Sequence, residues 1–475
     1  APVAFKPSLE GLGKRQGGIP LGANSMTFTN SILTGLVISS LVASASALAF
    51  DTKRADEQAA ATLRIASDGE VDPGAVGGRG LAIFSKKLVL CEWQGRDVIN
   101  NGVIMIRDGK IEAVGKRGEL LPPPDYALMD VGDQWVTPGL VEMHCHVAGR
   151  FGLNDMVYLA NPGIRASADV FAGNSQLDLA VAGGVTTVLY IPGSGTNVGG
   201  QGVLVRTGFD TYEASVIKNP GSLKLAQAGN PERWLTRPNR SFMNWNTRLT
   251  FKKGVAYAQE WEAYERDGGV MPRKDPQWEV FRNLRKRDIH ISTHTQIYQV
   301  VLMTITLVHD ELGLPFFIDH GTFDSYRVAE EAEKRGIFAC LGPRNIDVPS
   351  ASFRGFAGSN PERIQGVAAG YQERGFTRIG FNTDSPVIPQ EELQLQASMA
   401  VRYGFDESKM GTLRGLTIVP AMAGGIGDQV GSLEVGKFAD ILITSGDITD
   451  PRHTVELALQ QGQVIYDAVN QKRRW

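Results

Sequence analysis

The stretch Val136-Thr137-Pro138-Gly139-Leu140-Val141-Glu142-Met143-His144-Cys145-His146 carries the strongest signal in this chain. Its apolar part predicts a β-strand, which ends in two histidines separated by one residue. Side chains alternate across a strand with a period of two, so His144 and His146 are expected to face the same way. Two neutral imidazoles on one face make half of a metal site. Taken alone, the pair is better explained as two histidines that end a strand, so the rest of the chain has to decide.

Composition places the chain among ordinary globular proteins. It has 475 residues, of which 42% are hydrophobic and 21% charged, so more than one folding unit or one large barrel is expected. The formal net charge of -3 gives no electrostatic reason to expect a nucleic acid or an anionic membrane as a partner. The cysteines are odd in number and far apart, which excludes a disulfide framework and a zinc ribbon; they are Cys91, Cys145 and Cys340.

The N-terminal part reads as a leader that precedes the fold. An apolar run from Ile32 to Val42 is followed by small residues of the A-x-A type at Ala45-Ser46-Ala47. This pattern predicts a secretory signal peptide cleaved near Ala49, and therefore a periplasmic or secreted protein with no membrane contact after cleavage. A single membrane anchor is the alternative. Residues 50–78 are polar and read as a flexible lead-in.

Eight short β-rich runs alternate with longer helical ones in the middle of the chain, which predicts an α/β fold, a (β/α)8 TIM-type barrel. A polar helical insertion, Lys252 to Arg287, either covers the barrel mouth or lies outside. The expected strands are Leu140–Met143, Val185–Ile191, Gly202–Arg206, Leu223–Gln227, Ile289–Thr293, Pro315–Asp319, Ile337–Leu341 and Arg378–Asn382.

Both ends of the chain carry strand-like runs with turn signals, such as Asp108-Gly109-Lys110 near the start and Ala439-Asp440-Ile441-Leu442-Ile443 near the end. We expect them to form one small β-sandwich. The predicted division is 1–49 leader, 50–78 lead-in, 79–136 first part of the sandwich, 137–428 barrel, and 429–475 second part of the sandwich.

Functional groups of such a barrel lie at the C-terminal ends of its strands. Four of the seven histidines fall at predicted strand ends, and a carboxylate follows the last strand. Four imidazoles and a carboxylate suit zinc or a similar divalent metal, one or two ions per chain. The residues concerned are His144, His146, His294, His320 and Asp384.

Over about residues 80–470 the chain resembles the amidohydrolase superfamily of metal-dependent hydrolases, and within it the imidazolonepropionase-like branch. The residues that carry the resemblance are the stretch ending in His144-Cys145-His146, the histidines of the fifth and sixth strands, Thr383-Asp384-Ser385, and Gly431 to Asp440. Gly199-Gly200-Gln201-Gly202 and Leu223-Lys224-Leu225-Ala226 add the resemblance to the branch.

The resemblance implies a role for each site residue. His144, His146 and Asp384 would hold the more buried metal, and Asp384 would also take a proton from the water that attacks the substrate carbonyl. His294 and His320 would hold a second metal, or else contact the substrate and water. These three residues, Asp384, His294 and His320, are therefore also the predicted catalytic residues.

Lys224 has two interpretations. It lies on the predicted fourth strand, where binuclear members of the family carry a carbamylated lysine that bridges two metals. The alternative is a lysine that forms a salt bridge inside the barrel mouth. The chain also departs from the branch next to this strand, because Ala228-Gly229-Asn230-Pro231 stands where related sequences have Gly-Glu-Asn-Pro.

The sequence thus predicts a metal-dependent amidohydrolase that cleaves a C–N bond of a small-molecule substrate: a cyclic amide, an N-acyl amino acid or a dipeptide. A metallo-dipeptidase of the prolidase type is one alternative. An inactive barrel that serves as a binding protein is the other. The oligomeric state stays open, a homo-oligomer included.

Overall fold

The computed structural model describes residues 80–150, 154, 157–233, 237–348 and 364–470. All of them belong to one unit that spans Ala61–Trp475. The predicted signal peptide and lead-in lie outside the described residues, so export stays a prediction. Within the described ranges, no helix has both the length and the apolar character that crossing a membrane requires.

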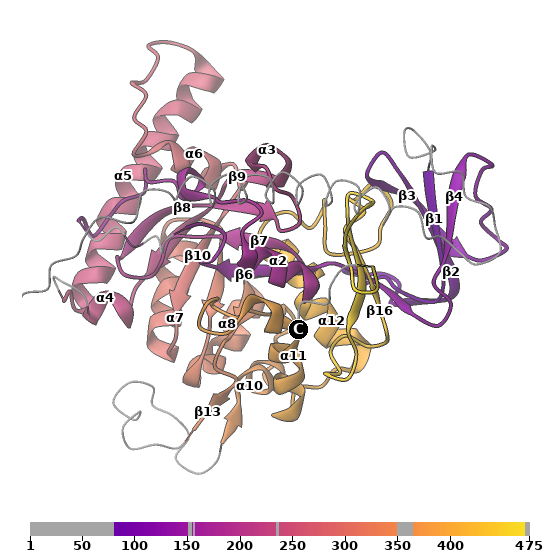
Figure 1. Ribbon diagram of the computed structural model, residues 1–475. Coiled ribbons are helices and arrows are strands. Elements are labelled where there is room, and N and C mark those ends of the chain that lie inside the picture. The colour runs from indigo at the N-terminus through magenta and orange to yellow at the C-terminus, as the bar shows by residue number, and fades with distance from the viewer. Residues whose placement is uncertain (1–79, 151–153, 155–156, 234–236, 349–363, 471–475) are drawn as a thin grey trace, which may run out of the picture. The chain divides into compact units, whose positions relative to one another are not determined.

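An eight-stranded sheet with the order β15-β12-β11-β10-β9-β8-β7-β6 forms the centre of the chain (Figure 1). Each of the eight segments predicted as barrel strands overlaps one of its strands. The sheet is nearly closed, as a barrel requires. Its strands are β6 (Leu140–Cys145), β7 (Val185–Tyr190), β8 (Val198–Arg206), β9 (Val216–Ala226), β10 (His290–Thr295), β11 (Phe316–His320), β12 (Phe338–Leu341) and β15 (Ile379–Phe381).

One strand departs from the regular strand–helix repeat. β8 pairs antiparallel with both β7 and β9, whereas the other neighbours in the sheet are parallel. Only residues 191–197 separate β7 from β8. A parallel crossover needs a dozen or more residues, so this short connection dictates a hairpin. The expectation of eight uniform strand–helix repeats is therefore wrong at this position.

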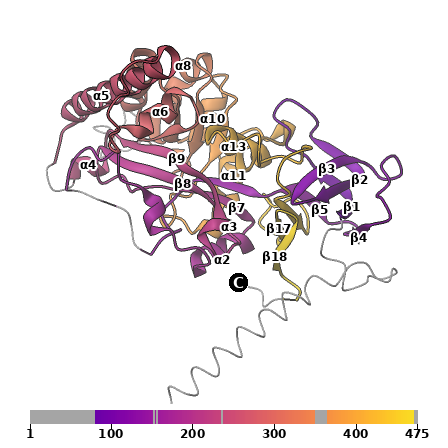
Figure 2. The ribbon, with the colours of Figure 1, turned by 90° about the horizontal axis from the view of Figure 1, so that it is seen from above.

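Helices cover the outside of the sheet (Figure 2). The α-helices are α2 (Ser175–Ala182), α3 (Tyr212–Ser215), α4 (Asn230–Arg233), α5 (Arg240–Asp267), α6 (Glu279–Arg285), α7 (Tyr298–Thr304), α8 (Ala329–Lys334), α10 (Val367–Gln372), α11 (Leu393–Arg402), α12 (Gly411–Leu416) and α13 (Ile418–Ala423). Shorter helical turns are η1 (Ala166–Asp169), η3 (Phe323–Val328), η4 (Gln390–Glu392) and η5 (Ser408–Met410), with a π-helix, η2 (Ile305–Glu311), and a small hairpin of β13 (Ile346–Asp347) and β14 (Gln365–Gly366).

The long helix α5 accounts for most of the predicted insertion, and it lies on the outside of the barrel together with α6 (Figure 2). Asn239 begins it by accepting a hydrogen bond from the amide of Phe242. Gly254 lies flat against the ring of Phe281 in α6. The N-terminal part of α5 contacts the β7–β8 loop, where Thr247 donates a hydrogen bond to Asn197.

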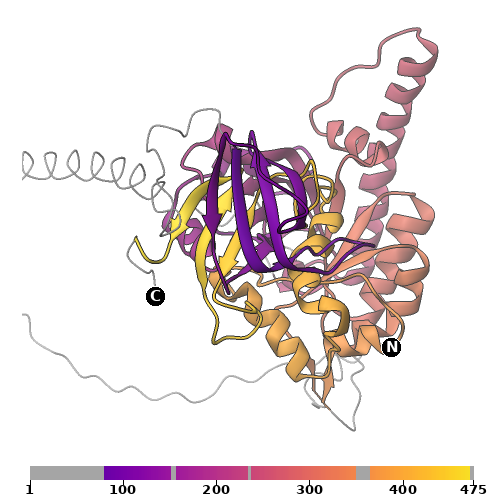
Figure 3. The ribbon, with the colours of Figure 1, turned by 90° about the vertical axis from the view of Figure 1, so that its right-hand side faces the viewer.

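The two ends of the chain meet in a second sheet of eight strands, with the order β18-β17-β16-β5-β1-β2-β3 and β4 beside β1. Figure 3 shows the indigo N-terminal strands beside the yellow C-terminal ones, and β16 pairs antiparallel with β5. The hydrogen bonds define one continuous sheet, and its description as a sandwich stays a prediction. Its strands are β1 (Gly80–Val89), β2 (Val98–Arg107), β3 (Lys110–Lys116), β4 (Tyr126–Asp130), β5 (Trp135–Pro138), β16 (Ile441–Thr444), β17 (Val455–Gln460) and β18 (Gln463–Asp467).

Candidate metal centre

His144 and His146 lie at the C-terminal end of β6, and their side chains converge as strand alternation requires. Their Nε2 atoms are 3.0 Å apart. The Nδ1–H of His146 donates to the carbonyl of Ile191, 2.9 Å away, which leaves Nε2 with its lone pair free. Cys145 between them is fully buried in the hydrophobic core.

Asp384 completes this group from the loop after β15. Its Oδ1 atom lies 3.0 Å from Nε2 of His144 and 3.4 Å from Nε2 of His146. The backbone of Asp384 has a φ of +51°, which non-glycine residues seldom adopt. Such local strain persists where the surroundings hold a residue in a required position, and functional sites are the usual places.

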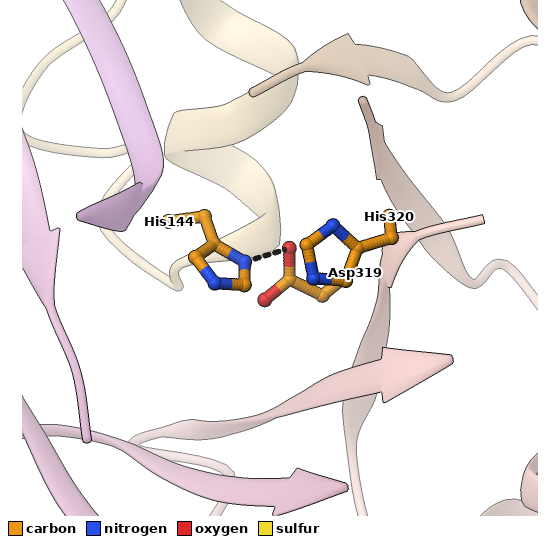
Figure 4. A group of neighbouring side chains, drawn as sticks. All are labelled: His144, Asp319 and His320. Carbon is orange, nitrogen blue, oxygen red and sulfur yellow. Dashed lines mark ion pairs between the residues drawn. The ribbon is translucent and has the colours of Figure 1, made fainter. Parts of the chain in front are cut away.

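His294 of β10 and His320 of β11 form a second pair. Nδ1 of His294 is 2.8 Å from Nε2 of His320, and Nδ1–H of His320 donates to the carbonyl of Gly342 at 2.8 Å. That second bond leaves Nε2 of His320 free to act as a ligand atom. The rings of His320 and His144 are 4.5 Å apart, so the two pairs belong to one site (Figure 4). His320 also has a positive φ, +76°.

The sequence analysis missed Asp319, which lies at the centre of the site. Its Oδ1 atom forms an ion pair with Nδ1 of His144 at 2.7 Å (Figure 4). Its Oδ2 atom accepts a hydrogen bond from Ser292 at 2.6 Å. In the structure Phe317, two residues before Asp319 on the same strand, packs among side chains of other barrel strands. Alternation along β11 therefore directs Asp319 into the barrel.

Lys224 is fully buried on β9, next to Asp319. Its Nζ atom lies 3.3 Å from Oδ2 of Asp319 and donates to Oγ of Ser292 at 3.4 Å. Burial lowers the pKa of the Lys224 amine, although the nearby carboxylates act in the opposite direction. The structure thus contains the salt bridge that one interpretation expected, and the role of Lys224 as a metal ligand stays a prediction.

Charge is unevenly distributed over the four histidines. Burial lowers the pKa of His320 to about 4, and it holds the pKa of His294 well below its usual range. Burial acts the same way on His144, but Asp319 and Asp384 outweigh it and raise the pKa of His144 to about 9. At neutral pH the His294–His320 pair is therefore neutral, whereas His144 carries a proton when nothing else occupies the site.

The donor set fits a divalent metal. Ligand atoms bound about 2.0–2.2 Å from one tetrahedral zinc ion lie roughly 3.3 Å apart, close to the 2.8–3.4 Å separations found here. Two groups of three residues bring one ligand atom each within 4.8 Å of one another. Two atoms that both carry lone pairs, such as two imidazole nitrogens, approach this closely only when a proton or a cation lies between them. The groups are His144, His146 and Asp384, and His144, Asp319 and His320.

A second missed residue, Glu142, lies fully buried beside the candidate metal ligand His144. Its Oε1 accepts from the amide of His144, and its Oε2 accepts from the amide and the hydroxyl of Thr383. Burial raises the pKa of Glu142 to about 7, and these hydrogen bonds moderate that rise. No pattern in the sequence pairs residues 142 and 383, because 241 positions separate them.

Comparison with known proteins agrees with this geometry. The amidohydrolase family model matches residues 135–470. An imidazolonepropionase of Sphingopyxis alaskensis is 24% identical over 383 residues, which are 75% of this chain and 89% of that protein. The amidohydrolase tasK of Hapsidospora irregularis is 24% identical over 392 residues, 75% of this chain, but the chain spans only 38% of its length.

Solved structures share the architecture. The crystal structure of an amidohydrolase from Thermotoga maritima has a TM-score of 0.70 at 25% identity, and the match covers 82% of this chain and all of that one. A prolidase complexed with n-methylphosphonate-l-proline has a TM-score of 0.50 at 16% identity, covering 81% of this chain and 99% of that one. The second likeness concerns the fold alone.

Proposed function

The chain belongs to the amidohydrolase family, and from this membership we propose that it is a metal-dependent hydrolase of C–N bonds in small molecules. The observation that carries the proposal is the convergence of four histidines and Asp384 at the ends of β6, β10, β11 and β15. His144, His146 and Asp384 would hold one divalent ion, for which zinc suits the donors best. His294 and His320 would hold a second ion or orient the substrate.

A divalent ion in this position lowers the pKa of water and polarises a carbonyl oxygen. The residues of the chain supply the rest of the reaction. Asp384 keeps 20% of its side chain exposed, whereas His144 is completely buried. The carboxylate of Asp384 is therefore accessible to a water molecule and a substrate. It would take a proton from the attacking water and pass it to the leaving nitrogen.

The family suggests which substrate classes to test, and the neutral histidines suggest how the site could act on them. His294 and His320 stay uncharged at physiological pH, because burial lowers the pKa of both. As neutral groups they can bind a metal or accept a proton from a substrate. We propose a cyclic amide as the first class to test, since imidazolonepropionases are among the relatives. N-acyl amino acids and dipeptides with a C-terminal proline are the next classes to test.

Export remains part of the proposal. The apolar run from Ile32 to Val42 and the small residues after it support a secretory leader. A cell-fractionation experiment with a C-terminal tag tests it. Recovery of a chain shortened by about fifty residues outside the cytoplasm is expected, and a full-length cytoplasmic product contradicts it.

The test of the activity is a substrate panel with the zinc-loaded full chain. The panel contains five- and six-membered cyclic amides, N-acetyl amino acids and Xaa-Pro dipeptides, and hydrolysis is followed by the release of a carboxylate or an amine. Turnover of one class, abolished by Asp384→Asn and preserved in Asp440→Asn, supports the proposal. Asp440 is a suitable control because it is a buried carboxylate at the opposite end of β6, where its carbonyl accepts from Gly139. Binding of a panel compound without turnover favours the inactive binding protein instead.

A further inference from the structure

The barrel closes at a narrow seam. β6 and β15 are the two ends of the strand order. A single parallel bridge, between Cys145 and Ser385, and the hydrogen bond from the amide of His146 to the carbonyl of Ser385 join them at the level of the site. His144 and His146 lie on one side of this seam, and Asp384 lies on the other. The spacing of the ligands therefore depends on how firmly the seam is held.

Glu142 is the side chain that spans the seam. Oε1 accepts from the amide of His144 at 2.9 Å on the β6 side. Oε2 accepts from the amide of Thr383 at 2.8 Å, from its hydroxyl at 2.7 Å, and from Nε2 of Gln390 at 3.2 Å, all on the far side. Each backbone amide that it binds belongs to a metal ligand or to the residue directly before one.

Only a carboxylate can satisfy all four donors. Both oxygens of an ionised carboxylate accept, whereas a glutamine offers one oxygen and an NH2 group that donates. In either orientation of a glutamine, its NH2 group would face a backbone N–H, that of His144 on β6 or that of Thr383 across the seam. Because the site is fully buried, no water replaces the lost acceptor, and the two strand ends would move apart.

We propose that Glu142 is a positioning residue that fixes the metal centre by holding the two ends of the barrel sheet together. This inference rests on the proposed function in one respect, since it assumes that His144, His146 and Asp384 bind a metal. Glu142 itself touches neither substrate nor metal in this arrangement. Its effect is exerted through the backbone of His144 and Thr383, and it sets the geometry on which metal affinity depends.

The test measures metal binding and not turnover. The Zn(II) dissociation constant of the full chain is determined at pH 8 by competition with a chromogenic chelator, for the wild type, Glu142→Gln and Thr383→Val. The visible spectrum of the Co(II)-substituted proteins reports the coordination geometry. We expect Glu142→Gln to weaken Zn(II) binding about 10-fold to 100-fold, as loss of a supporting partner does at other sites, and to change the Co(II) spectrum. Thr383→Val removes one of the four donors to Glu142 and should have a smaller effect in the same direction. It is the milder variant, to be used if Glu142→Gln does not fold.

Asp440→Asn is the matched control, because it alters a buried carboxylate away from the seam. It should leave the zinc constant and the cobalt spectrum unchanged, even if it lowers the melting temperature. A wild type that binds no metal contradicts the proposed function. A wild type that binds zinc, with Glu142→Gln and Thr383→Val binding it equally and showing the same cobalt spectrum, overturns the inference about Glu142 alone.

Discussion

At the scale of single residues, Asp319 connects the buried polar side chains of the site. It contacts Nδ1 of His144 at 2.7 Å and Nζ of Lys224 at 3.3 Å. When one ring nitrogen of a metal-binding histidine donates a hydrogen bond to a carboxylate, the ring orientation and the tautomer are fixed. The other ring nitrogen then becomes a stronger metal ligand. Asp319 would therefore strengthen Nε2 of His144 as a ligand for the proposed metal.

Replacing Asp319 with asparagine should weaken zinc binding about 10-fold to 100-fold. The amide keeps the size of the side chain but removes the charge that balances His144 and Lys224. The measurement is a zinc titration against a chelator. Asp169→Asn is a fitting control, because Asp169 accepts a hydrogen bond from Tyr190 and is absent from the candidate ligand groups. Equal zinc affinity in Asp319→Asn and the wild type would contradict this role.

A pH dependence follows from His144. Its pKa is raised from 6.5 to about 9 in the folded, metal-free protein, so zinc must displace a proton at neutral pH. The apparent zinc affinity should therefore increase as pH rises from about 6.5 to about 9, with proton release on binding. The same raised pKa stabilises the metal-free fold fully below pH 6.5, and this contribution is lost as pH rises through about 9.

Calorimetry in buffers of different ionisation enthalpy counts the released protons. We expect the proton of His144 to be released on zinc binding at pH 7. Zinc binding without any proton release at pH 7 would show that His144 is already neutral, and the charge arrangement described here would be incorrect.

The sequence identified residues whose role is visible in local spacing. His144 and His146 share a strand face, and His294, His320 and Asp384 follow predicted strands. Asp319 and Glu142 were missed for different physical reasons. Asp319 precedes His320, and strand alternation predicts that the two side chains point to opposite faces. The positive φ of His320 breaks this alternation, so that both side chains reach the site. Glu142 works through a partner that only the closed barrel brings near.

At the scale of elements, the eight barrel strands were predictable because each is a short apolar run between turn signals. The direction of β8 was predicted wrongly, as one of eight parallel strands, because periodicity carries no information about parallel or antiparallel pairing. Loop length does carry it, and residues 191–197 are too few for a crossover. The location of α5 also needed the structure, because a polar helix pattern fits a lid and an outer layer equally well.

The contact between α5 and α6 gives a prediction at this scale. A Cβ atom on Gly254 would lie 2.2 Å from the ring of Phe281, so Gly254→Ala should push the helices apart. The variant should be destabilised by about 1–3 kcal/mol from overpacking, against the ~1 kcal/mol that alanine gains over glycine in helix propensity. Urea denaturation measures the free energy of unfolding.

Gln259→Ala on the exposed side of α5 is the control for helix propensity. It should leave the free energy of unfolding within about 0.5 kcal/mol of the wild type. A Gly254→Ala variant that is as stable as the wild type, or more stable, would mean that α5 and α6 are not packed as described.

At the scale of the whole described unit, the two ends of the chain make one sheet, and the sequence predicted that they would combine. The side chain of Gln460 on β17 then joins this sheet to the barrel. Its Oε1 accepts from the amide of Gly208 at 2.8 Å, and its Nε2 donates to the carbonyl of Thr186 on β7. Gln460 is completely buried, so these bonds have no competition from water.

Gln460→Leu should therefore lower the free energy of unfolding by about 1–3 kcal/mol, because the half-buried amide of Gly208 loses its acceptor and the carbonyl of Thr186 keeps only the amide of Thr207 as a donor. Gln463→Leu is the matched control, since Gln463 is exposed on the neighbouring strand β18. Urea denaturation followed by circular dichroism compares the two. If both variants unfold at the wild-type urea concentration, Gln460 does not connect the sheets.

This fold brings four histidines and Asp384 together, and we propose that they bind a catalytic divalent metal. The most direct test is the zinc content per chain of the full protein after zinc loading and dialysis at pH 8, measured by elemental analysis. We expect at least one equivalent of zinc per chain in the wild type. In the double variant His144→Ala/His146→Ala, the zinc bound by His144, His146 and Asp384 should be lost. A second equivalent that disappears in Lys224→Ala would assign Lys224 as a ligand. A wild-type protein that retains no metal would contradict the account.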